Sequence, residues 1–179
     1  MKENLFKKKN DDLIGYLNRL QTWRVKVDLL KDQINKLAKL KDFPIFCIAA
    51  FLLKSQIVEF ELKEMFISLD LEVAIKLRIS NSDLTREIRD PSDFDNKTLG
   101  QTITCFCEYK GMVTEKLKKQ LQDLNALRNK FTHHMFDAKT DIRTLTDDAE
   151  KGLALANVIL DQLNTLSLKL KEKWEQNAK

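Results

Sequence analysis

Residues 117–135 have the sequence LKKQLQDLNALRNKFTHHM. Their apolar side chains recur in alternating steps of four and three, which is the period of an amphipathic α-helix. These side chains are Leu117, Leu121, Leu124, Phe131 and Met135, and Arg128 takes the remaining place in the stripe. With the residues from Val113 onward, the pattern predicts a helix that buries one face in a helical core.

The same period recurs near the N-terminus, where it is the clearest periodicity of the chain. The stripe there consists of Leu13, Tyr16, Leu20, Trp23, Val27, Leu30, Ile34 and Leu37. It predicts one long helix from about Asp11 to Leu40. This helix either completes the intramolecular bundle or packs on a partner chain.

Capping residues and helix breakers divide the middle of the chain. Asp42, followed by a proline two residues later, predicts a helix from Phe43 to about Leu77. The first part of this helix, Ile45–Leu53, is apolar nearly all round, which favours a central place in the core. Residues 78–97 read as a connection with one short helical turn at Leu84–Ile88.

Three further boundaries follow from the same kinds of signal. A short helix is expected from Leu99 to Tyr109, ended by Gly111 as its C-cap. Thr114 is the expected N-cap of the helix that carries residues 117–135. The last helix should start near Thr146, and the charged tail after Lys171 should fray.

Composition supports an all-α protein, since the 179 residues include only four glycines and two prolines, with 43% hydrophobic and 32% charged residues. We predict a single domain (1–179), an up-and-down bundle of about four to five helices with its core at about 43–170 and a frayed tail at 171–179. No apolar run approaches the roughly 20 residues of a membrane span, and the N-terminus lacks the apolar segment of a signal peptide. We therefore expect a cytoplasmic protein that binds no membrane.

The sequence offers no sign of a bound metal or cofactor. The three cysteines, Cys47, Cys105 and Cys107, are an odd number without metal-ligand spacing and are expected to be reduced thiols. No metal-ligand cluster and no nucleotide-binding glycine loop stands out. We expect no metal and no cofactor.

Positive charge gathers around both histidines, although the whole chain carries only +4. Between Tyr109 and Phe136 there are six Lys or Arg against two Asp or Glu. Such an excess suits a phosphate-bearing partner, and a solvated helix face would give the same counts. If the partner is RNA, Lys118, Lys119 and Lys130 are the candidate contacts.

Arg128 and His133 form an Arg-x4-His pair. Residues five apart on a straight helix lie about 140° apart around the axis and about 7.5 Å along it, so these two cannot close on one small group. Joint action needs a local break in the helix or a second copy of the chain facing the first. Alternatively, Arg128 is a core-edge residue that pairs with one of the glutamates Glu59, Glu61 or Glu64.

The segment from Leu124 to His133 resembles the signature of the HEPN superfamily, an Arg-polar pair followed by a histidine four to six residues after the arginine. Upstream, Thr98-Leu99-Gly100-Gln101 and residues 109–114 are similar to the lead-in of the branch typified by the mannitol-operon repressor. The likeness covers roughly residues 46–166. It implies a helical domain whose arginine and histidine meet those of a second protomer at a dimer interface.

Carried over by position, the catalytic residues implied by the resemblance are Arg128 and His133, with Asn129 as the supporting polar residue and His134 as an extra histidine. The implied activity is metal-independent cleavage of RNA by a homodimer, in toxin function, phage defence or stress response, with an antitoxin or regulatory protein as a further partner. In this chemistry a neutral imidazole takes the 2′-hydroxyl proton, a protonated one gives a proton to the leaving 5′-oxygen, and a guanidinium holds the phosphate oxygens.

Three hypotheses therefore stand. A cleft that exposes Arg128 and His133 from two chains would favour a HEPN-type endoribonuclease. An interface made by the Leu13–Leu37 stripe, far from the motif, would favour a non-catalytic regulator or protein-interaction module like the mannitol-repressor branch. An ion-paired Arg128 buried against Glu59 or Glu64 of its own chain would favour a helical bundle in which the motif is structural.

Overall fold

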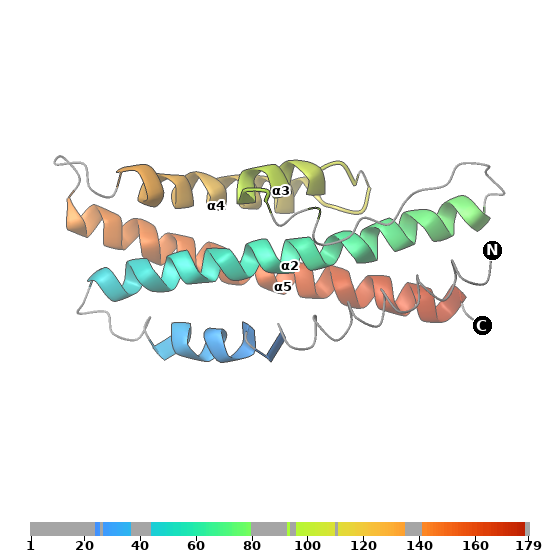
Figure 1. The fold of residues 1–179 in the computed structure, drawn as a ribbon, viewed down its shortest axis with the longest axis horizontal. Coiled ribbons are helices and arrows are strands. Elements are labelled where there is room, and N and C mark those ends of the chain that lie inside the picture. The colour runs from blue at the N-terminus through green and yellow to red at the C-terminus, as the bar shows by residue number, and fades with distance from the viewer. Residues whose placement is uncertain are drawn as a thin grey trace.

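The computed structural model describes residues 24–25, 27–36, 44–79, 93, 96–109, 111–134 and 141–177. Its regular elements are α2 (Pro44–Ile79), α3 (Leu99–Phe106), α4 (Glu115–His134) and α5 (Ile142–Asn177), preceded by a helical segment at 27–36. All of them are helices, which confirms the predicted all-α class. In Figure 1, α2 and α5 run in one direction while α4 and the segment 27–36 run in the other, as in an up-and-down bundle.

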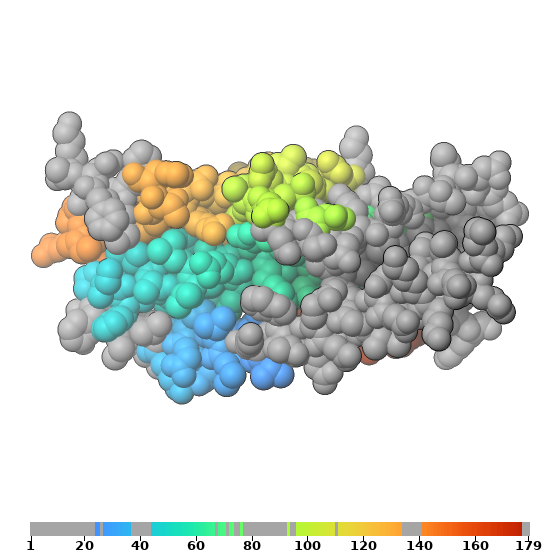
Figure 2. Space-filling model, in the orientation of Figure 1, coloured from blue at the N-terminus to red at the C-terminus, as the bar shows by residue number. Residues whose placement is uncertain are grey.

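The two longest helices, α2 and α5, form a central pair. In Figure 2, α3 and α4 lie on one side of α2 and the segment 27–36 lies on the other. On one side lie α3 and α4, which share a large apolar core with the pair. On the other side, Val27 and Ile34 pack against Ala50 and Ile57 of α2. Because α2 meets apolar neighbours in two directions, it needs apolar side chains around most of its circumference. This explains the apolar run at Ile45–Leu53, of which Ile45 itself is exposed.

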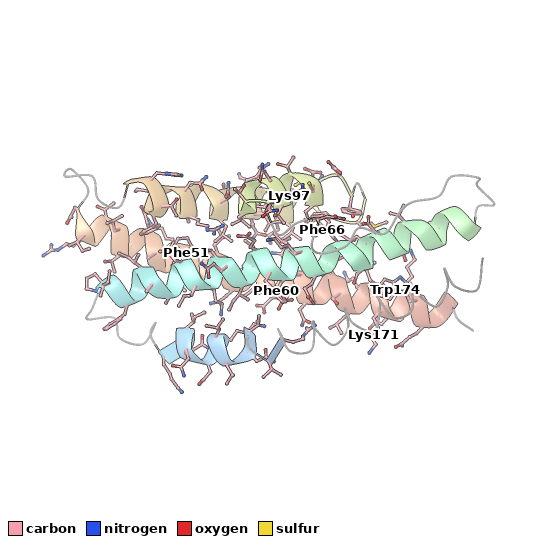
Figure 3. The ribbon with its side chains drawn as sticks, in the orientation of Figure 1. Phe51, Phe60, Phe66, Lys97, Lys171 and Trp174 are labelled. Carbon is pink, nitrogen blue, oxygen red and sulfur yellow. The ribbon has the colours of Figure 1, made fainter. Side chains whose placement is uncertain are left out.

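Aromatic side chains join the central pair to α3 and α4. Phe51 of α2 packs on Phe131 of α4, with the ring centroids 5.2 Å apart. Phe66 packs edge-on against Phe106 at 6.0 Å. Figure 3 shows Phe51 and Phe66 on the side of α2 that faces α3 and α4, and Phe60 on the opposite side. Gly152 of α5 leaves room for Phe51, since a Cβ atom there would lie 2.3 Å from its ring.

The N-terminal stripe is confirmed where the structure describes it, with one exception. Val27 and Ile34 are buried, but Leu30 is 40% exposed. Val27 and Ile34 lie almost on one line along a helix, whereas Leu30 lies about 60° from Val27 around the axis. Only the first line faces α2 and α5. The other members of the stripe, Leu13, Tyr16, Leu20, Trp23 and Leu37, lie outside the described residues.

The short helix α3 begins as expected but ends earlier. Thr98 is its N-cap and forms a capping box with Gln101, so the Thr-x-x-Gln of the lead-in has a structural role. The helix stops at Phe106 rather than Tyr109, and Gly111 lies in the following turn with φ +78°. After the end of the helix, the hydroxyl of Tyr109 donates to the buried carboxylate of Asp70 on α2.

The boundaries of α5 also differ from those predicted. The helix starts at Ile142 instead of near Thr146, because Asp141 accepts from the backbone N–H of Arg143 and so acts as the N-terminal cap. It continues to Asn177 instead of fraying after Lys171. Lys173 and Trp174 both donate to the buried carboxylate of Glu72. This contact anchors the charged end of α5 to α2.

Some of the remaining predicted boundaries are confirmed, and others lie outside the described residues. α2 and α4 lie where they were expected, and Thr114 accepts from the N–H of Leu117 as the N-cap of α4. Asp42, the turn at Leu84–Ile88 and Met135 lie outside the described residues. None of the helices in the described part of the chain is long and apolar enough to cross a membrane.

Candidate functional site

The Arg-x4-His motif lies in the last two turns of α4. The helix is continuous to His134, so the local break that could bring Arg128 and His133 together does not occur. Leu117, Leu121, Leu124 and Phe131 are buried, as the stripe predicts. Arg128 therefore lies at the edge of the apolar core, on the side of α4 that faces α2.

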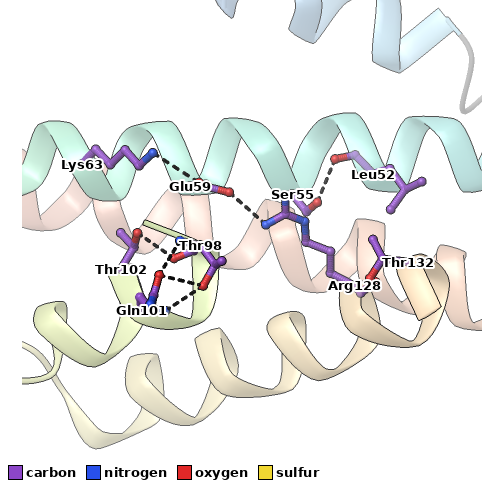
Figure 4. A network of polar contacts seen from close by, with 9 residues as sticks. All are labelled: Leu52, Ser55, Glu59, Lys63, Thr98, Gln101, Thr102, Arg128 and Thr132. Carbon is purple, nitrogen blue, oxygen red and sulfur yellow. Dashed lines mark hydrogen bonds and ion pairs between the residues drawn. The ribbon is translucent and has the colours of Figure 1, made fainter. Parts of the chain in front are cut away.

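Arg128 is held by a carboxylate of the same chain. Its Nη1 donates to Oε2 of Glu59 on α2 at 2.9 Å, and Nζ of Lys63 lies 3.2 Å from the other oxygen of Glu59 (Figure 4). The side chains are largely but not fully covered, with exposed fractions of 23% for Arg128, 16% for Glu59 and 17% for Lys63. The cluster thus contains two cations and one carboxylate, and its net charge is positive.

Two other motif residues, Asn129 and His133, are exposed on α4. His134 is the last residue of the helix, and its side chain lies outside the described part of the structure. A single chain thus presents Arg128 and His133 on different sides of one helix and does not bring them together.

The three candidate lysines have different surroundings. Lys130 pairs with Asp148 of α5 at 2.5 Å, and Lys118 pairs with Glu115 one turn away at 2.6 Å. Lys119 is exposed. Pairs of this kind at a surface are weak and can exchange for a phosphate group, so they do not exclude contact with RNA. Among the described residues, no group of three or more His, Cys, Asp or Glu is arranged to hold a metal ion.

Of the two residues that surround Arg128, the sequence predicted one. Glu59 was one of three expected partners for Arg128. Lys63 was missed, although it lies four residues after Glu59, the spacing at which oppositely charged side chains meet on a helix. Glu61 faces the other side of α2, where it pairs with Lys31 at 3.4 Å.

The contact between Arg128 and Glu59 is of the kind expected if the motif is structural. The burial that the structural hypothesis also requires is incomplete, because almost a quarter of the Arg128 side chain is exposed. A guanidinium carries five N–H donors, and the bond to Glu59 uses one of them. The geometry of Arg128 therefore suits a fixed surface cation as well as a structural ion pair.

Comparison of the chain with protein families, with curated proteins and with solved structures finds no match.

Proposed function

We propose that this protein is a HEPN-type endoribonuclease that cleaves RNA without a metal ion as a homodimer, with Arg128 and His133 as its catalytic residues. The observation that carries the proposal is the partly exposed Arg128 side chain, whose guanidinium is held by Glu59, beside an exposed face of α4 that presents Asn129 and His133. A role in toxin function, phage defence or stress response belongs to the same proposal, as does an antitoxin or regulatory partner.

Glu59 supports catalysis by fixing the direction of the guanidinium. A free arginine side chain loses rotamer freedom when it binds a phosphate, and this loss weakens binding. Arg128 is already oriented by a charged hydrogen bond at 2.9 Å. Lys63 balances the charge of Glu59, so the carboxylate does not cancel the attraction of Arg128 for a phosphate oxygen.

The chemistry is a transfer within the RNA strand. One His133 imidazole removes the proton of a 2′-hydroxyl, whose oxygen then forms a bond to the adjacent phosphorus. The bond from phosphorus to the 5′-oxygen breaks, and the imidazolium formed in the first step returns its proton, through water, to that oxygen. The products are a 2′,3′-cyclic phosphate and a 5′-hydroxyl, while Arg128 stabilises the charge on the non-bridging oxygens.

The continuous α4 makes a second copy of the chain necessary for this chemistry. Arg128 and His133 diverge by about 140° around the helix axis. In the proposed dimer, the exposed part of Arg128 of one protomer meets His133 of the other across a two-fold axis.

The first test is cleavage of labelled transfer RNA and messenger RNA in EDTA, with wild type, Arg128→Ala and His133→Ala. Ser167→Ala, an exposed change on α5, is the control. We expect wild type and control to cut, and both motif variants to lose at least a hundredfold in rate while they keep their fold. Absence of cutting by folded wild type over a wide panel would favour the non-catalytic regulator or interaction module.

Mixed dimers test the shared site directly. Arg128→Ala and His133→Ala chains, co-expressed with different tags and purified as the heterodimer, form one complete site and one doubly defective site. We expect about half of the wild-type rate from the heterodimer, although each parent is inactive. An inactive heterodimer would contradict a site built from two chains.

A structural role for Arg128 is the second candidate, because the Glu59 contact favours it. In that case Arg128→Ala lowers the free energy of unfolding and His133→Ala has no effect on any activity. Equal loss of cleavage in the two variants, without loss of stability in His133→Ala, would reject this candidate.

A further inference from the structure

A cavity of about 290 Å³ lies between α3 and α4, one turn of α4 before Arg128. Its lining consists of Gly100, Ile103, Thr104, Cys107, Gln122 and Asn125. The volume is close to the lower end of the roughly 300 to 1,000 Å³ that small-molecule pockets occupy. None of the uses of the motif described above involves this cavity.

The lining combines apolar and polar groups and carries no charged side chain. Gln122 and Asn125 each bring an amide with two donors and an acceptor. Thr104 donates its hydroxyl proton to the carbonyl of Gly100 at 3.0 Å, so its oxygen remains able to accept. Burial raises the pKa of the Cys107 thiol, with Lys118 opposing and Glu115 adding to this effect, so the thiol stays neutral. A flat, uncharged ligand with donors and acceptors along its edge fits this chemistry.

The position of Asn125 depends on a glycine. A Cβ atom on Gly100 would lie 3.1 Å from Nδ2 of Asn125, so the amide of α4 rests directly against the backbone of α3. No hydrogen bond within the described part of the chain takes up the side-chain amide of Asn125 or Gln122. Asn125 is thus packed against α3 at the cavity and Gln122 is exposed beside it, and both amides have hydrogen-bonding capacity left for a ligand.

The cavity lies beside the motif on the same helix. Asn125 is about 60° around the axis from Arg128 and about 80° from His133, and it precedes His133 by about 12 Å. The exposed Asn129 lies between Asn125 and His133 on this surface. A short length of single-stranded RNA can therefore contact the motif and still place one of its bases at the cavity.

We infer that the cavity between α3 and α4 is a nucleobase subsite, in which Asn125 and Gln122 hydrogen-bond the edge of one unpaired base of an RNA strand held at the motif. This inference rests on the proposed function, because it takes RNA as the ligand of α4. Proteins read single-stranded RNA chiefly through such edge contacts to unstacked bases. An Asn or Gln amide pairs with adenine through two hydrogen bonds, so adenine is the expected base.

Binding of RNA that cannot be cut tests the subsite apart from catalysis. The probes are 2′-O-methyl oligouridine and the same strand with one central adenosine, guanosine or cytidine, with Kd measured by fluorescence anisotropy in EDTA. We expect wild type to bind the adenosine strand about tenfold more tightly than oligouridine. Asn125→Ala should abolish this preference, and Gly100→Ala should reduce it by displacing Asn125.

Asn164→Ala is the matched control, since it removes an exposed amide from α5. It should keep the full preference for adenosine. Gln122→Ala, at an exposed position, replaces Asn125→Ala if the latter does not fold. Equal Kd values for all four strands in wild type, or a preference that survives Asn125→Ala and Gln122→Ala, would overturn the subsite.

Alkylation of Cys107 gives a second readout. In a Cys105→Ser background, with Cys47 buried, the adenosine strand should slow the reaction of Cys107 with a maleimide, because the base covers the thiol. Unchanged reactivity at saturating RNA would contradict the inference. Cleavage of unmodified RNA is measured in parallel. Cleavage without base preference rejects the subsite alone, whereas base preference without cleavage keeps the subsite and rejects the nuclease.

Discussion

Arg128 and Glu59 are 69 residues apart in the chain, yet Nη1 of Arg128 lies 2.9 Å from Oε2 of Glu59. The contact joins α4 to α2, and Lys63 completes it from the other side of the carboxylate. The same arginine thus belongs both to the proposed catalytic motif and to the packing of the bundle. The two roles call for variants that separate them.

Exchange of the two charges separates packing from catalysis. Arg128→Glu places two carboxylates together and should lower the free energy of unfolding by about 1–2 kcal/mol. The double variant Glu59→Arg/Arg128→Glu re-forms an ion pair and should regain most of that loss in urea denaturation. It moves the guanidinium to α2, so RNA cleavage should stay at the level of Arg128→Ala. Recovery of cleavage along with stability would show that Arg128 acts only through the fold.

Gly152 should not tolerate even a methyl group. Replacement of a glycine inside a helix by alanine usually stabilises by about 0.5–1 kcal/mol. Here the new Cβ would lie 2.3 Å from Cε2 of Phe51, whose ring is fully buried against Phe131. We expect Gly152→Ala to destabilise by about 1–3 kcal/mol in urea denaturation.

A smaller partner for the new methyl group provides the control. Phe51→Leu/Gly152→Ala should lose less stability than the sum of the two single variants, because the leucine leaves room for the methyl group. Additive losses would mean that the contact between Gly152 and Phe51 is not what limits residue 152.

Glu64 should make the protein less stable as the pH rises towards neutrality. Burial, together with the nearby Glu61, raises the pKa of Glu64 from 4.5 to about 7, and Arg24 opposes the shift. Between about pH 4.5 and 7 the folded state therefore holds a proton that the unfolded state has lost, so stability falls through this window. Glu64→Gln should raise the melting temperature at pH 8 and leave it nearly unchanged at pH 4.5. An equal effect at both pH values would contradict this assignment.

Glu72 should act in the opposite sense. Its burial favours the neutral acid, but hydrogen bonds from Lys173 and Trp174 and the charge of Lys76 lower its pKa overall. Its contribution to stability is present above its unfolded pKa of about 4.5 and is lost as the pH falls through its lower folded value. Trp174→Phe removes one donor and should cost about 1–2 kcal/mol in urea denaturation at pH 7. The same change should cost less at pH 3.

Sequence periodicity was sufficient to predict the buried residues of helices that bury one face. It was insufficient to predict a helix end that depends on a contact with another part of the chain. The stripe of α4 predicted which side chains are buried. The predicted end of α5 was wrong because Lys173 and Trp174 bind Glu72, about a hundred residues earlier in the chain. No local sequence pattern near them indicates this contact. The early start of the same helix depends on Asp141 as a cap, whereas the acidic residues after Thr146 gave the more obvious local signal.

The candidate site shows the same limit. Three glutamates on α2 were possible partners for Arg128. The choice among them depends on how α2 is rotated about its own axis relative to α4. The apolar residues of α2 surround the helix because it is covered on two sides, so its pattern has no single buried face from which to read that rotation. In the folded chain the partner is Glu59. The cavity beside Gly100 could not be predicted from the sequence either, because it depends on the distance between α3 and α4.

The bond between Glu59 and Arg128 also has a consequence for related sequences. If the orientation of the guanidinium matters for what α4 does, selection acts on the pair and not on the arginine alone. Chains that diverged from a common ancestor with this one should keep or lose the carboxylate of α2 together with the arginine of α4, while the residues between them drift. A motif defined by arginine and histidine alone would then group together sequences in which the arginine is held and sequences in which it is not.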